Sequence, residues 1–515
     1  MHGFETILIV MAAAVVLSLV AQRLKAPFPP FVALAGAGVA FLPFAPEITL
    51  DPALVLALFV APVLLDAAFD SSLRDLKRNA VPIAFLSLVA VGVTVAAVAF
   101  TAKALMPALP WAAAVTLGAI VAPPDAAAAT AVLRIIPVPY RVRTILEGES
   151  LFNDASALLI YRLAVGATLA TMPQGWMLAG AVTWALVGSV VFALAAAWLQ
   201  TRLMRMLSSA PASITLQFIG AFGVWIVAER LGLSAIITIV VFAMAAARMT
   251  ARSSAEIRAP AYAVWETVVF ALNVLAFMLV GLQIGPIWRG LEVAQREEYA
   301  TFALLILGVC VAARIGWVMT YNTVVQIKNR LFGVDLPEGA ARPTMKSGVV
   351  VAWAGMRGVV SLAAAYALPL NFPNRDLILL AVFAVVMGTL VVQGLTLGPL
   401  IKALGLGNDG VLEAEIRKAR EACTDAAIAC VTGREDAPAK RLRAEYKERR
   451  AAIASAGEGD GRVKLPVDEL AEHVLNAKRE RLLTMRMSGE ISDAAYYQIE
   501  EELDRYVLAL TPVVR

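Results

Sequence analysis

The sequence predicts an all-α polytopic membrane protein with about 13 transmembrane helices and a cytoplasmic helical tail. Three observations support this fold class: an apolar composition, a series of long apolar runs, and an uneven distribution of basic residues between loops. Of the 515 residues, 60% are hydrophobic and 16% are charged, and the mean hydropathy is +0.75. Soluble proteins carry about 25% charged residues. The composition therefore excludes a soluble enzyme, a nucleic-acid-binding protein and a disordered scaffold.

The charged residues divide the chain into two parts. Residues 1–402 carry 45 of the 84 Asp, Glu, Lys and Arg residues, whereas the last 113 residues carry 39. We expect a transmembrane domain over 1–402 and a cytoplasmic helical domain over 403–515. Only three cysteines are present, Cys310, Cys423 and Cys430. Two of them lie in the tail, which is typical of a reducing compartment.

A membrane-spanning helix needs about 20 predominantly apolar residues. The runs that meet this need are 4–22, 28–45, 52–69, 80–102, 111–133, 145–171, 176–200, 213–229, 232–249, 262–284, 300–321, 347–369 and 376–400. The first run has no basic segment before it and no cleavage site after it, so it is interpreted as a span and not as a cleaved signal.

Basic residues in the short loops orient these spans. Eighteen Lys and Arg residues lie in one set of alternate loops, and five lie in the other set: Lys103, Arg230, Arg289, Arg296 and Arg375. Because cytoplasmic loops of membrane proteins are enriched in Lys and Arg, we expect the N-terminus outside and the tail in the cytoplasm. The expected location is the cell (inner) membrane.

Two spans contain residues that interrupt a helix near mid-depth. Pro123 and Pro124 remove two backbone donors in the fifth span, and Gly355-Met356-Arg357-Gly358 places a charge between two glycines in the twelfth. If the spans form two six-helix halves joined by one linker helix, the interrupted spans are the fifth of each half. Broken helices in matching positions of inverted repeats are typical of a transporter with a midplane binding site.

The sixth span carries the polar sequence Gly148-Glu-Ser-Leu-Phe-Asn-Asp154. Asp154 lies about 14 Å into this span, near the middle of a bilayer core of about 30 Å. Ser150 shares its helix face, and Glu149 and Asn153 form a second pair one turn apart. Oxygen ligands of this kind suit a small hard cation, with Asp125 and backbone carbonyls near Pro124 as further ligands. The alternative is a buried polar cluster that only joins helices.

Further charges inside the spans need an explanation. Arg162, Arg314 and Glu266 are more consistent with structural ion pairs or with residues at a span end than with a functional site. Arg357 requires a buried anion, for which Glu149 is the first candidate and Asp125 the second; such an ion pair would be structural. Asp66 lies in an apolar run shortly before a cytoplasmic loop, and it is equally consistent with a functional site and with a structural ion pair.

At these residues the sequence resembles the electroneutral sodium/proton exchangers of the monovalent cation/proton antiporter superfamily. The matching segments are residues 148–154, Phe59-Val-Ala-Pro-Val-Leu-Leu-Asp66-Ala-Ala, Phe277-Met-Leu-Val-Gly-Leu-Gln283 and Trp353-Ala-Gly-Met-Arg357-Gly-Val-Val-Ser361. The resemblance covers the whole membrane part. One departure is visible: the family usually has Asp-Pro in the fifth span, whereas here Pro124 precedes Asp125.

The resemblance implies a thirteen-helix homodimer in which a core domain moves against a dimer domain. It also implies that Asp154 carries both the cation and the proton, with Asn153, Ser150 and the broken fifth span completing the site, and that Glu149 pairs with Arg357. The expected activity is exchange of Na⁺ or Li⁺ for H⁺ at 1:1 stoichiometry, which serves pH and sodium homeostasis. No cofactor is expected beyond the transported ions, and the expected partners are lipid and a second subunit, with no nucleic acid.

Several alternatives stay open at this point. A K⁺/H⁺ antiporter fits the same motifs, and a cation channel would not need paired breaks and a titratable carrier. A membrane enzyme is disfavoured because the sequence contains no H-E-x-x-H or G-x-S-x-G motif. The tail contains amphipathic stretches near 411–430, 439–455, 466–487 and 490–509, which suit either regulation or passive dimerisation.

Overall fold

A computed structural model describes residues 28–42, 52–133, 138–169, 176–250, 254–332, 344–455 and 466–488, together with isolated residues at 136 and near both termini. All regular secondary structure within these ranges is helical. The chain divides into two compact units, residues 1–407 and 408–515. The first predicted span, 4–22, and the fourth tail stretch, 490–509, lie largely outside the described residues.

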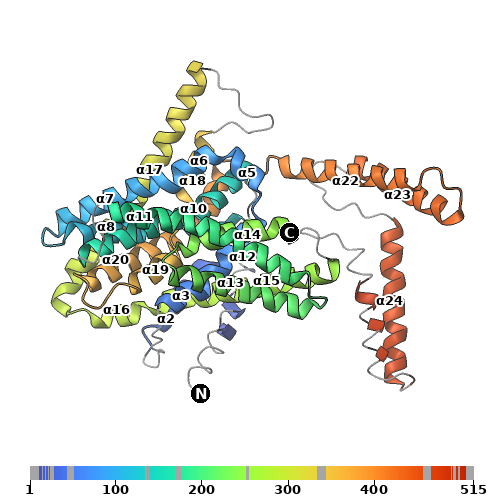
Figure 1. The fold of residues 1–515 in the computed structure, drawn as a ribbon, viewed down its shortest axis with the longest axis horizontal. Helices are drawn as coiled ribbons and strands as arrows, with labels where there is room; N and C mark the ends of the chain where they lie inside the picture. The colour runs from blue at the N-terminus through green and yellow to red at the C-terminus, as the bar shows by residue number, and fades with distance from the viewer. Residues whose placement is uncertain are drawn as a thin grey trace. The chain divides into compact units, whose positions relative to one another are not determined.

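Figure 1 shows the helices of the first unit, most of which fall within the other predicted spans. In chain order they are α2 (Phe28–Val39), α3 (Pro52–Val55), α4 (Ala61–Asp70), α5 (Leu73–Arg78), α6 (Ala80–Ala84), α7 (Val91–Leu105), α8 (Trp111–Val121), α9 (Ala126–Leu133), α10 (Tyr140–Thr168), α11 (Trp176–Thr183), α12 (Ser189–Met204), α13 (Ala210–Arg230), α14 (Ala235–Thr250), α15 (Ala255–Leu282), α16 (Ile284–Gly290), α17 (Arg296–Phe332), α18 (Met345–Trp353), α19 (Val359–Tyr366), α20 (Arg375–Gly388) and α21 (Gly394–Ala403). Short π-helical segments join α3 to α4, α6 to α7, α11 to α12 and α20 to α21.

Six of the described helical stretches are long and apolar enough to cross a membrane. They are Ala80–Leu105, Met177–Met204, Ala210–Arg230, Ala255–Gly290, Val293–Leu331 and Arg375–Ala403, and three shorter helices, Phe28–Val39, Trp111–Val121 and Ala235–Arg248, are apolar as well. The count of thirteen spans and the inverted repeat therefore stay predictions. The fifth and twelfth predicted spans are each divided into two short helices, α8 with α9 and α18 with α19. None of these four helices reaches the length of about 20 residues that one helix needs to cross a membrane.

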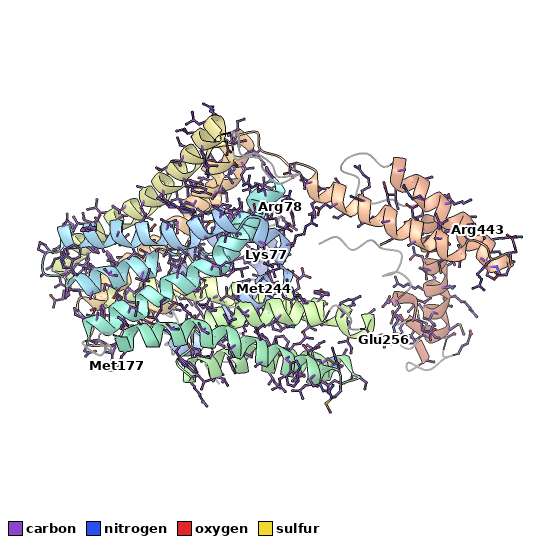
Figure 2. All side chains as sticks on the ribbon, turned by 45° about the horizontal axis from the view of Figure 1, so that its top comes forward. Lys77, Arg78, Met177, Met244, Glu256 and Arg443 are labelled. Carbon is purple, nitrogen blue, oxygen red and sulfur yellow. The ribbon has the colours of Figure 1, made fainter. Side chains whose placement is uncertain are left out.

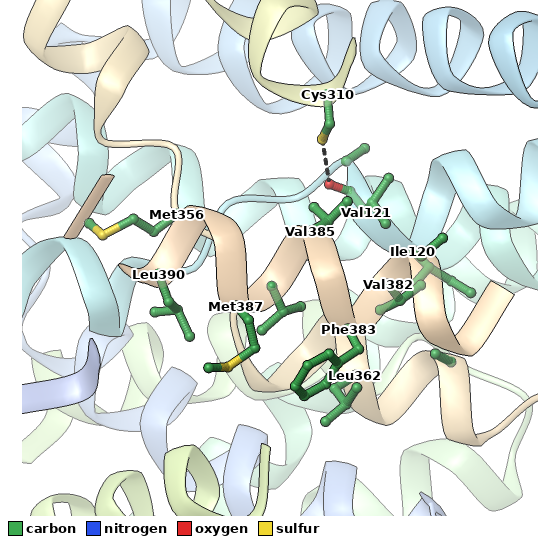
Figure 3. Close-up of a cluster of buried hydrophobic side chains, with 14 of the residues drawn as sticks. Ile120, Val121, Cys310, Met356, Leu362, Val382, Phe383, Val385, Met387 and Leu390 are labelled. Atoms are coloured by element: carbon green, nitrogen blue, oxygen red, sulfur yellow. Dashed lines mark hydrogen bonds between the residues drawn. The ribbon is translucent and has the colours of Figure 1, made fainter. Parts of the chain in front are cut away.

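Buried apolar side chains of the first unit form two large clusters. One cluster joins α7, α8, α10, α17, α18, α19 and α20, and Figure 3 shows part of it around Ile120, Leu362 and Val382. The other joins α4, α12, α13 and α14. The helix breaks contribute Ala122, Ala354 and Met356 to the first cluster, and α10 contributes Leu146 and Ala157. The first cluster is thus the part of the fold that packs around the breaks.

Close backbone contact joins α2 to α15. A Cβ atom added at Gly36 would overlap the carbonyl oxygen of Met278, and one added at Gly281 would overlap that of Ala33. Small residues at such positions let two helices approach until their backbones touch, which is a common packing mode in membranes.

A short basic helix follows α4. Lys77 and Arg78, which belong to the set of loops that carries most of the basic residues, lie on the short helix α5 between α4 and α6 (Figure 2).

The second unit contains α22 (Val411–Val431), α23 (Ala437–Ser455) and α24 (Pro466–Met487). These bounds match the first three amphipathic stretches that the sequence predicts.

Candidate functional site

The first helix break lies between α8 and α9, at residues 122–125. Pro123 and Pro124 have no N–H group, so α8 ends at Val121 and the carbonyl groups at its C-terminal end lack helical partners. Arg357 supplies two replacement donors, because its Nε lies 3.0 Å from the Val121 oxygen and its Nη2 lies 3.5 Å from the Ala122 oxygen. The Cys310 thiol also donates to the Val121 oxygen, at 3.3 Å (Figure 3).

The second break lies between α18 and α19, at residues 354–358. The Arg357 amide donates to Thr389 Oγ1 at 3.0 Å, and its Nη1 donates to the Gly355 carbonyl. The Asp125 amide from the first break donates to the Met356 oxygen at 2.6 Å. The two interrupted spans are therefore hydrogen-bonded directly to each other at their unwound segments.

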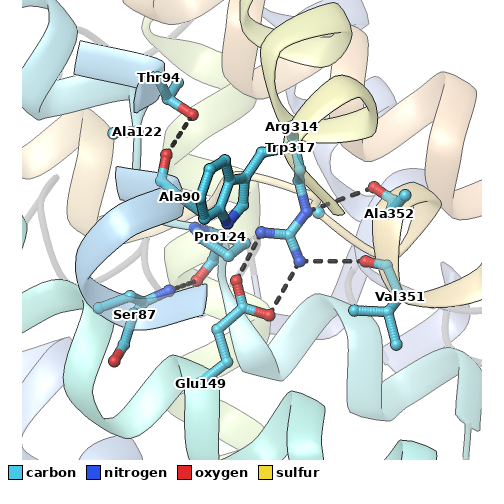
Figure 4. A network of polar contacts seen from close by, with 12 residues as sticks. Ser87, Ala90, Thr94, Ala122, Pro124, Glu149, Arg314, Trp317, Val351 and Ala352 are labelled. Carbon is cyan, nitrogen blue, oxygen red and sulfur yellow. Dashed lines mark hydrogen bonds and ion pairs between the residues drawn. The ribbon is translucent and has the colours of Figure 1, made fainter. Parts of the chain in front are cut away.

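The structure corrects the predicted partner of Glu149. Glu149 pairs with Arg314 of α17, with distances of 2.5 Å from Nη1 to Oε1 and 2.9 Å from Nη2 to Oε2 (Figure 4). The two side chains are 1% and 3% exposed. Arg314 also donates to the carbonyl groups of Val351 at 3.1 Å and Ala352 at 3.3 Å. The contact is bidentate, because two nitrogens of the planar guanidinium each donate to one oxygen of the carboxylate.

Arg357, the predicted partner of Glu149, is 0% exposed and donates to the backbone carbonyls of residues 121, 122 and 355. These oxygens lie at the C-terminal ends of α8 and α18. A helix C-terminus carries a partial negative charge of about half an elementary charge. Two such ends provide the negative potential that the sequence analysis assigned to a carboxylate, and this explains why the predicted Glu149–Arg357 pair is wrong.

Helix α10 places the polar residues of the sixth predicted span in the interior. Glu149, Ser150, Asn153 and Asp154 are all buried, with exposed fractions of 6% or less. Asn153 Nδ2 donates to the Pro124 oxygen at 2.8 Å, which connects α10 to the first break. Among the described residues, Asn153 Oδ1 has no hydrogen-bond partner although it is buried. Its carbonyl oxygen can therefore serve as a ligand.

Asp154 lines a small cavity that reaches both interrupted spans. The cavity has a volume of about 10 Å³ and is bounded by α8, α10, α19 and the first break, through residues that include Pro123, Tyr161 and Ser361. A cavity of this size has room for about one water molecule. A single dehydrated monovalent cation is a comparable occupant.

The other predicted site residues lie at different distances from this cavity. Asp125 is half-buried beside the second break, where a Cβ atom at Gly358 would overlap its carboxylate. Its charge lies close enough to interact with that of Asp154. Ser150 is buried one turn before Asp154 on α10, outside the cavity wall. The Pro124 carbonyl is already engaged by Asn153.

The structure does not bring Asp66 to Asp154. Asp66 of α4 lines a separate cavity of about 70 Å³, together with Phe69, Tyr262 and Trp265. The two cavities share no lining residue. Asp66 therefore belongs to a different part of the membrane unit.

The structure gives roles to three residues around the breaks. Arg314 neutralises Glu149, Thr389 accepts from the Arg357 amide, and Ser361 lines the cavity. The sequence favours a structural ion pair for Arg314, because an arginine within an apolar span needs a buried partner, but it does not predict Glu149 as that partner. No comparable signal marks Thr389.

This arrangement suits one monovalent ion. No group of three or more Asp, Glu, His or Cys side chains that could hold a metal ion occurs in the described part of the chain. Sites for divalent cations such as Ca²⁺ use several carboxylates. A single carboxylate in a small enclosed cavity can bind a proton or a monovalent cation, one at a time.

Comparison with known proteins agrees with this chemistry. The sequence profile of the transmembrane sodium/hydrogen exchanger family matches residues 9–403. A Na⁺/H⁺ antiporter, NhaH of Halobacillus aidingensis, is 28% identical over 79% of this chain and 100% of its own length. An uncharacterized Na⁺/H⁺ exchanger of Mycobacterium tuberculosis is 28% identical over 98% of this chain and 95% of its own length.

A solved structure shows the same fold. The sodium proton antiporter MjNhaP1 from Methanocaldococcus jannaschii aligns with a TM-score of 0.61 at 18% sequence identity, over 79% of this chain and 99% of its own. The family profile matches more than half of the chain, and apolar helices account for most of the matched part. The chain is therefore an integral membrane protein that belongs to the sodium/hydrogen exchanger family.

Proposed function

We propose that this protein exchanges Na⁺ or Li⁺ for H⁺ by alternating access, with Asp154 as the shared carrier of cation and proton. The observation that carries this proposal is the position of Asp154, a buried carboxylate in a cavity bounded by both interrupted spans. Family membership supports cation/proton antiport as the class of activity.

The ligand set follows from the oxygens around Asp154. The Asp154 carboxylate supplies the charge, the unpartnered Asn153 Oδ1 supplies a neutral ligand, and the Ser150 hydroxyl and Asp125 complete the set as the site rearranges. The hydrogen bond from Asn153 to Pro124 ties these ligands to the first break. Movement of the break would thus change the geometry around the cation.

The stoichiometry follows from the number of carboxylates in the cavity wall. Asp154 is the one acidic residue among the residues that line the described cavity, and its neighbour at position 153 is an amide. If Asp154 alone changes its protonation state while Asp125 keeps its charge, one proton is released for each cation bound, which gives 1:1, electroneutral exchange. Glu149 is excluded as a second carrier because Arg314 already neutralises it.

The cellular setting is proposed from the same chain. We place the protein in the cell (inner) membrane, and the loop charges favour an orientation with the N-terminus outside and the tail in the cytoplasm. We further propose a homodimer, whose physiological role is pH and sodium homeostasis. The relatives named as Na⁺/H⁺ antiporters support the choice of ions.

Proton release from acid-loaded proteoliposomes tests the proposal. A pH dye is followed as Na⁺, Li⁺ or K⁺ is added outside, for the wild type, for Asp154→Asn and for Asp376→Asn, which changes an exposed carboxylate on α20. We expect Na⁺- or Li⁺-dependent proton release that Asp154→Asn abolishes and Asp376→Asn retains.

Each contrary result removes a different part of the proposal. Exchange by Asp154→Asn would contradict the assignment of the carrier. Release with K⁺ alone would identify a K⁺/H⁺ antiporter, and cation flux without coupled proton movement would identify a channel.

A further inference from the structure

One face of α22 carries an apolar pattern that the transport site does not use. The apolar residues of this face follow one another at intervals of four and three residues in turn, which is the heptad pattern of a coiled-coil seam. The seam consists of Leu412, Ile416, Ala419, Cys423, Ala426 and Cys430. Ile416 is 41% exposed, both thiols are exposed, and so are Ala419 and Ala426.

This seam is separate from the contact between α22 and α23. Thr424 is buried in that contact, and Arg450 of α23 forms ion pairs with Glu421 at 3.5 Å and Asp425 at 2.9 Å. Arg443 of α23, labelled in Figure 2, donates to the Val431 oxygen at 2.7 Å. These positions lie on the side of α22 opposite the seam, so α23 fixes the helix while the seam faces away.

Charges beside the seam indicate which helix would cover it. With Ile416, Cys423 and Cys430 at the a positions, Glu415 occupies a g position and Arg420 the following e position. In a parallel, in-register pair of identical helices, each g residue faces the e residue five positions later on the partner. Glu415 of one chain would then face Arg420 of the other, and the symmetry creates this ion pair twice.

We propose that α22 pairs with α22 of a second copy of this chain as a short parallel coiled coil. Alanine and cysteine at the seam let the two helices approach closely, and Leu412 and Ile416 provide the larger apolar contact at its N-terminal end. A seam of fewer than three heptads is weak in isolation. Two chains held in one membrane raise the effective concentration of each helix for the other. This inference concerns assembly and does not depend on which ion is transported.

The two seam cysteines provide the test. In full-length protein in native membranes, Cys430→Ser leaves Cys423 as the tail thiol, and Cys423→Ser leaves Cys430. Parallel pairing places each cysteine opposite its own copy, so brief oxidation with copper phenanthroline should give a covalent dimer with both variants. An antiparallel pair can align at most one of the two positions. Dimer formation by only one variant, or by neither, would overturn the proposal.

Matched controls separate pairing from random collision. In the double variant Cys423→Ser/Cys430→Ser, which retains the buried Cys310, Ala419→Cys on the seam should cross-link at least tenfold faster than Ala414→Cys, which is exposed on the opposite side. Equal rates, or cross-links to a different protein, would contradict a homotypic seam.

Charge reversal tests the register independently. Glu415→Arg should slow the cross-linking of Cys423 severalfold, because it places arginines against Arg420 of the partner. The double change Glu415→Arg/Arg420→Glu restores opposite charges and should restore the rate. Failure of the double change to recover would exclude the parallel register.

Discussion

At the residue scale, two buried arginines perform different tasks within one apolar cluster. Arg314 neutralises a carboxylate, whereas Arg357 donates to buried carbonyl groups at the ends of two helices. Removing one partner of a buried ion pair leaves an unpaired charge and costs about 3–5 kcal/mol. The pair between Arg143 and Glu147 on the surface of α10 is about one-third or more exposed on each side, and such pairs contribute about 0–1 kcal/mol.

This contrast predicts the outcome of a double-mutant cycle. We expect Glu149→Gln and Arg314→Gln each to lower the apparent melting temperature in detergent by several degrees, and the double variant to recover part of the loss. Glu147→Gln, on the same helix, should change it little. Thermal unfolding followed by size-exclusion chromatography compares the wild type with these four variants, with Arg357→Gln and with the double variant Glu149→Gln/Arg357→Gln. A larger coupling of Glu149 with Arg357 than with Arg314 would contradict the assigned pair.

The sequence locates individual residues better than it locates their partners. The depth of Asp154 follows from counting residues along an apolar run, and the structure confirms that Asp154 is buried. The partner of Glu149 could not be predicted in this way, because spacing along α17 and α18 does not determine how these helices rotate and pack against α10. The prolines predict free carbonyl groups in the fifth span, but the sequence does not show that Arg357 of the twelfth span packs against them, so a carboxylate was expected as its partner.

At the element scale, hydrogen bonds join the two breaks into one unit. Pro123 and Pro124 predict the first break and the glycines around Arg357 predict the second, and the helices stop at residues 121 and 353 as expected. The contacts that join the breaks, from Asp125 to Met356 and from Arg357 to Val121 and Ala122, are visible only in three dimensions. The unit supplies part of the cavity wall around Asp154.

The two breaks pack closely against each other, so transport should be sensitive to a larger side chain at this contact. A methyl group at Gly358 would overlap the Asp125 carboxylate, and the φ of −144° at Gly358 is one that any residue adopts. The effect of Gly358→Ala is therefore steric. We expect it to slow cation-dependent proton release in proteoliposomes at least tenfold.

Gly92→Ala on α7 provides the control, because a Cβ atom there has no neighbour within 4 Å. Its exchange rate should stay near that of the wild type. A normal exchange rate for Gly358→Ala would show that the contact between the two breaks tolerates displacement of Asp125. The joined breaks would then lose their proposed role in the site.

At the scale of the whole molecule, the transport residues and the tail belong to different units. Asp154, both breaks and both arginines lie within residues 1–407, and the boundary at Gly407 falls just after α21. A chain truncated after Gly407 should therefore retain exchange with the same order of cations, measured by proton release in proteoliposomes. Loss of exchange by a truncated protein that remains monodisperse would show that the tail takes part in transport.

The final prediction concerns the charge moved per cycle. If Asp154 carries either one proton or one monovalent cation, each full cycle moves no net charge. A cycle that moved one elementary charge would gain about 2.3 kcal/mol from each 100 mV of membrane potential. With the Na⁺, K⁺ and H⁺ gradients all clamped at zero, a membrane potential imposed by an anion gradient should therefore produce no proton flux through the wild-type protein. A flux that reverses with the sign of the potential would require a second charge in the cycle, and Asp125, whose charge interacts with that of Asp154, would be its first candidate.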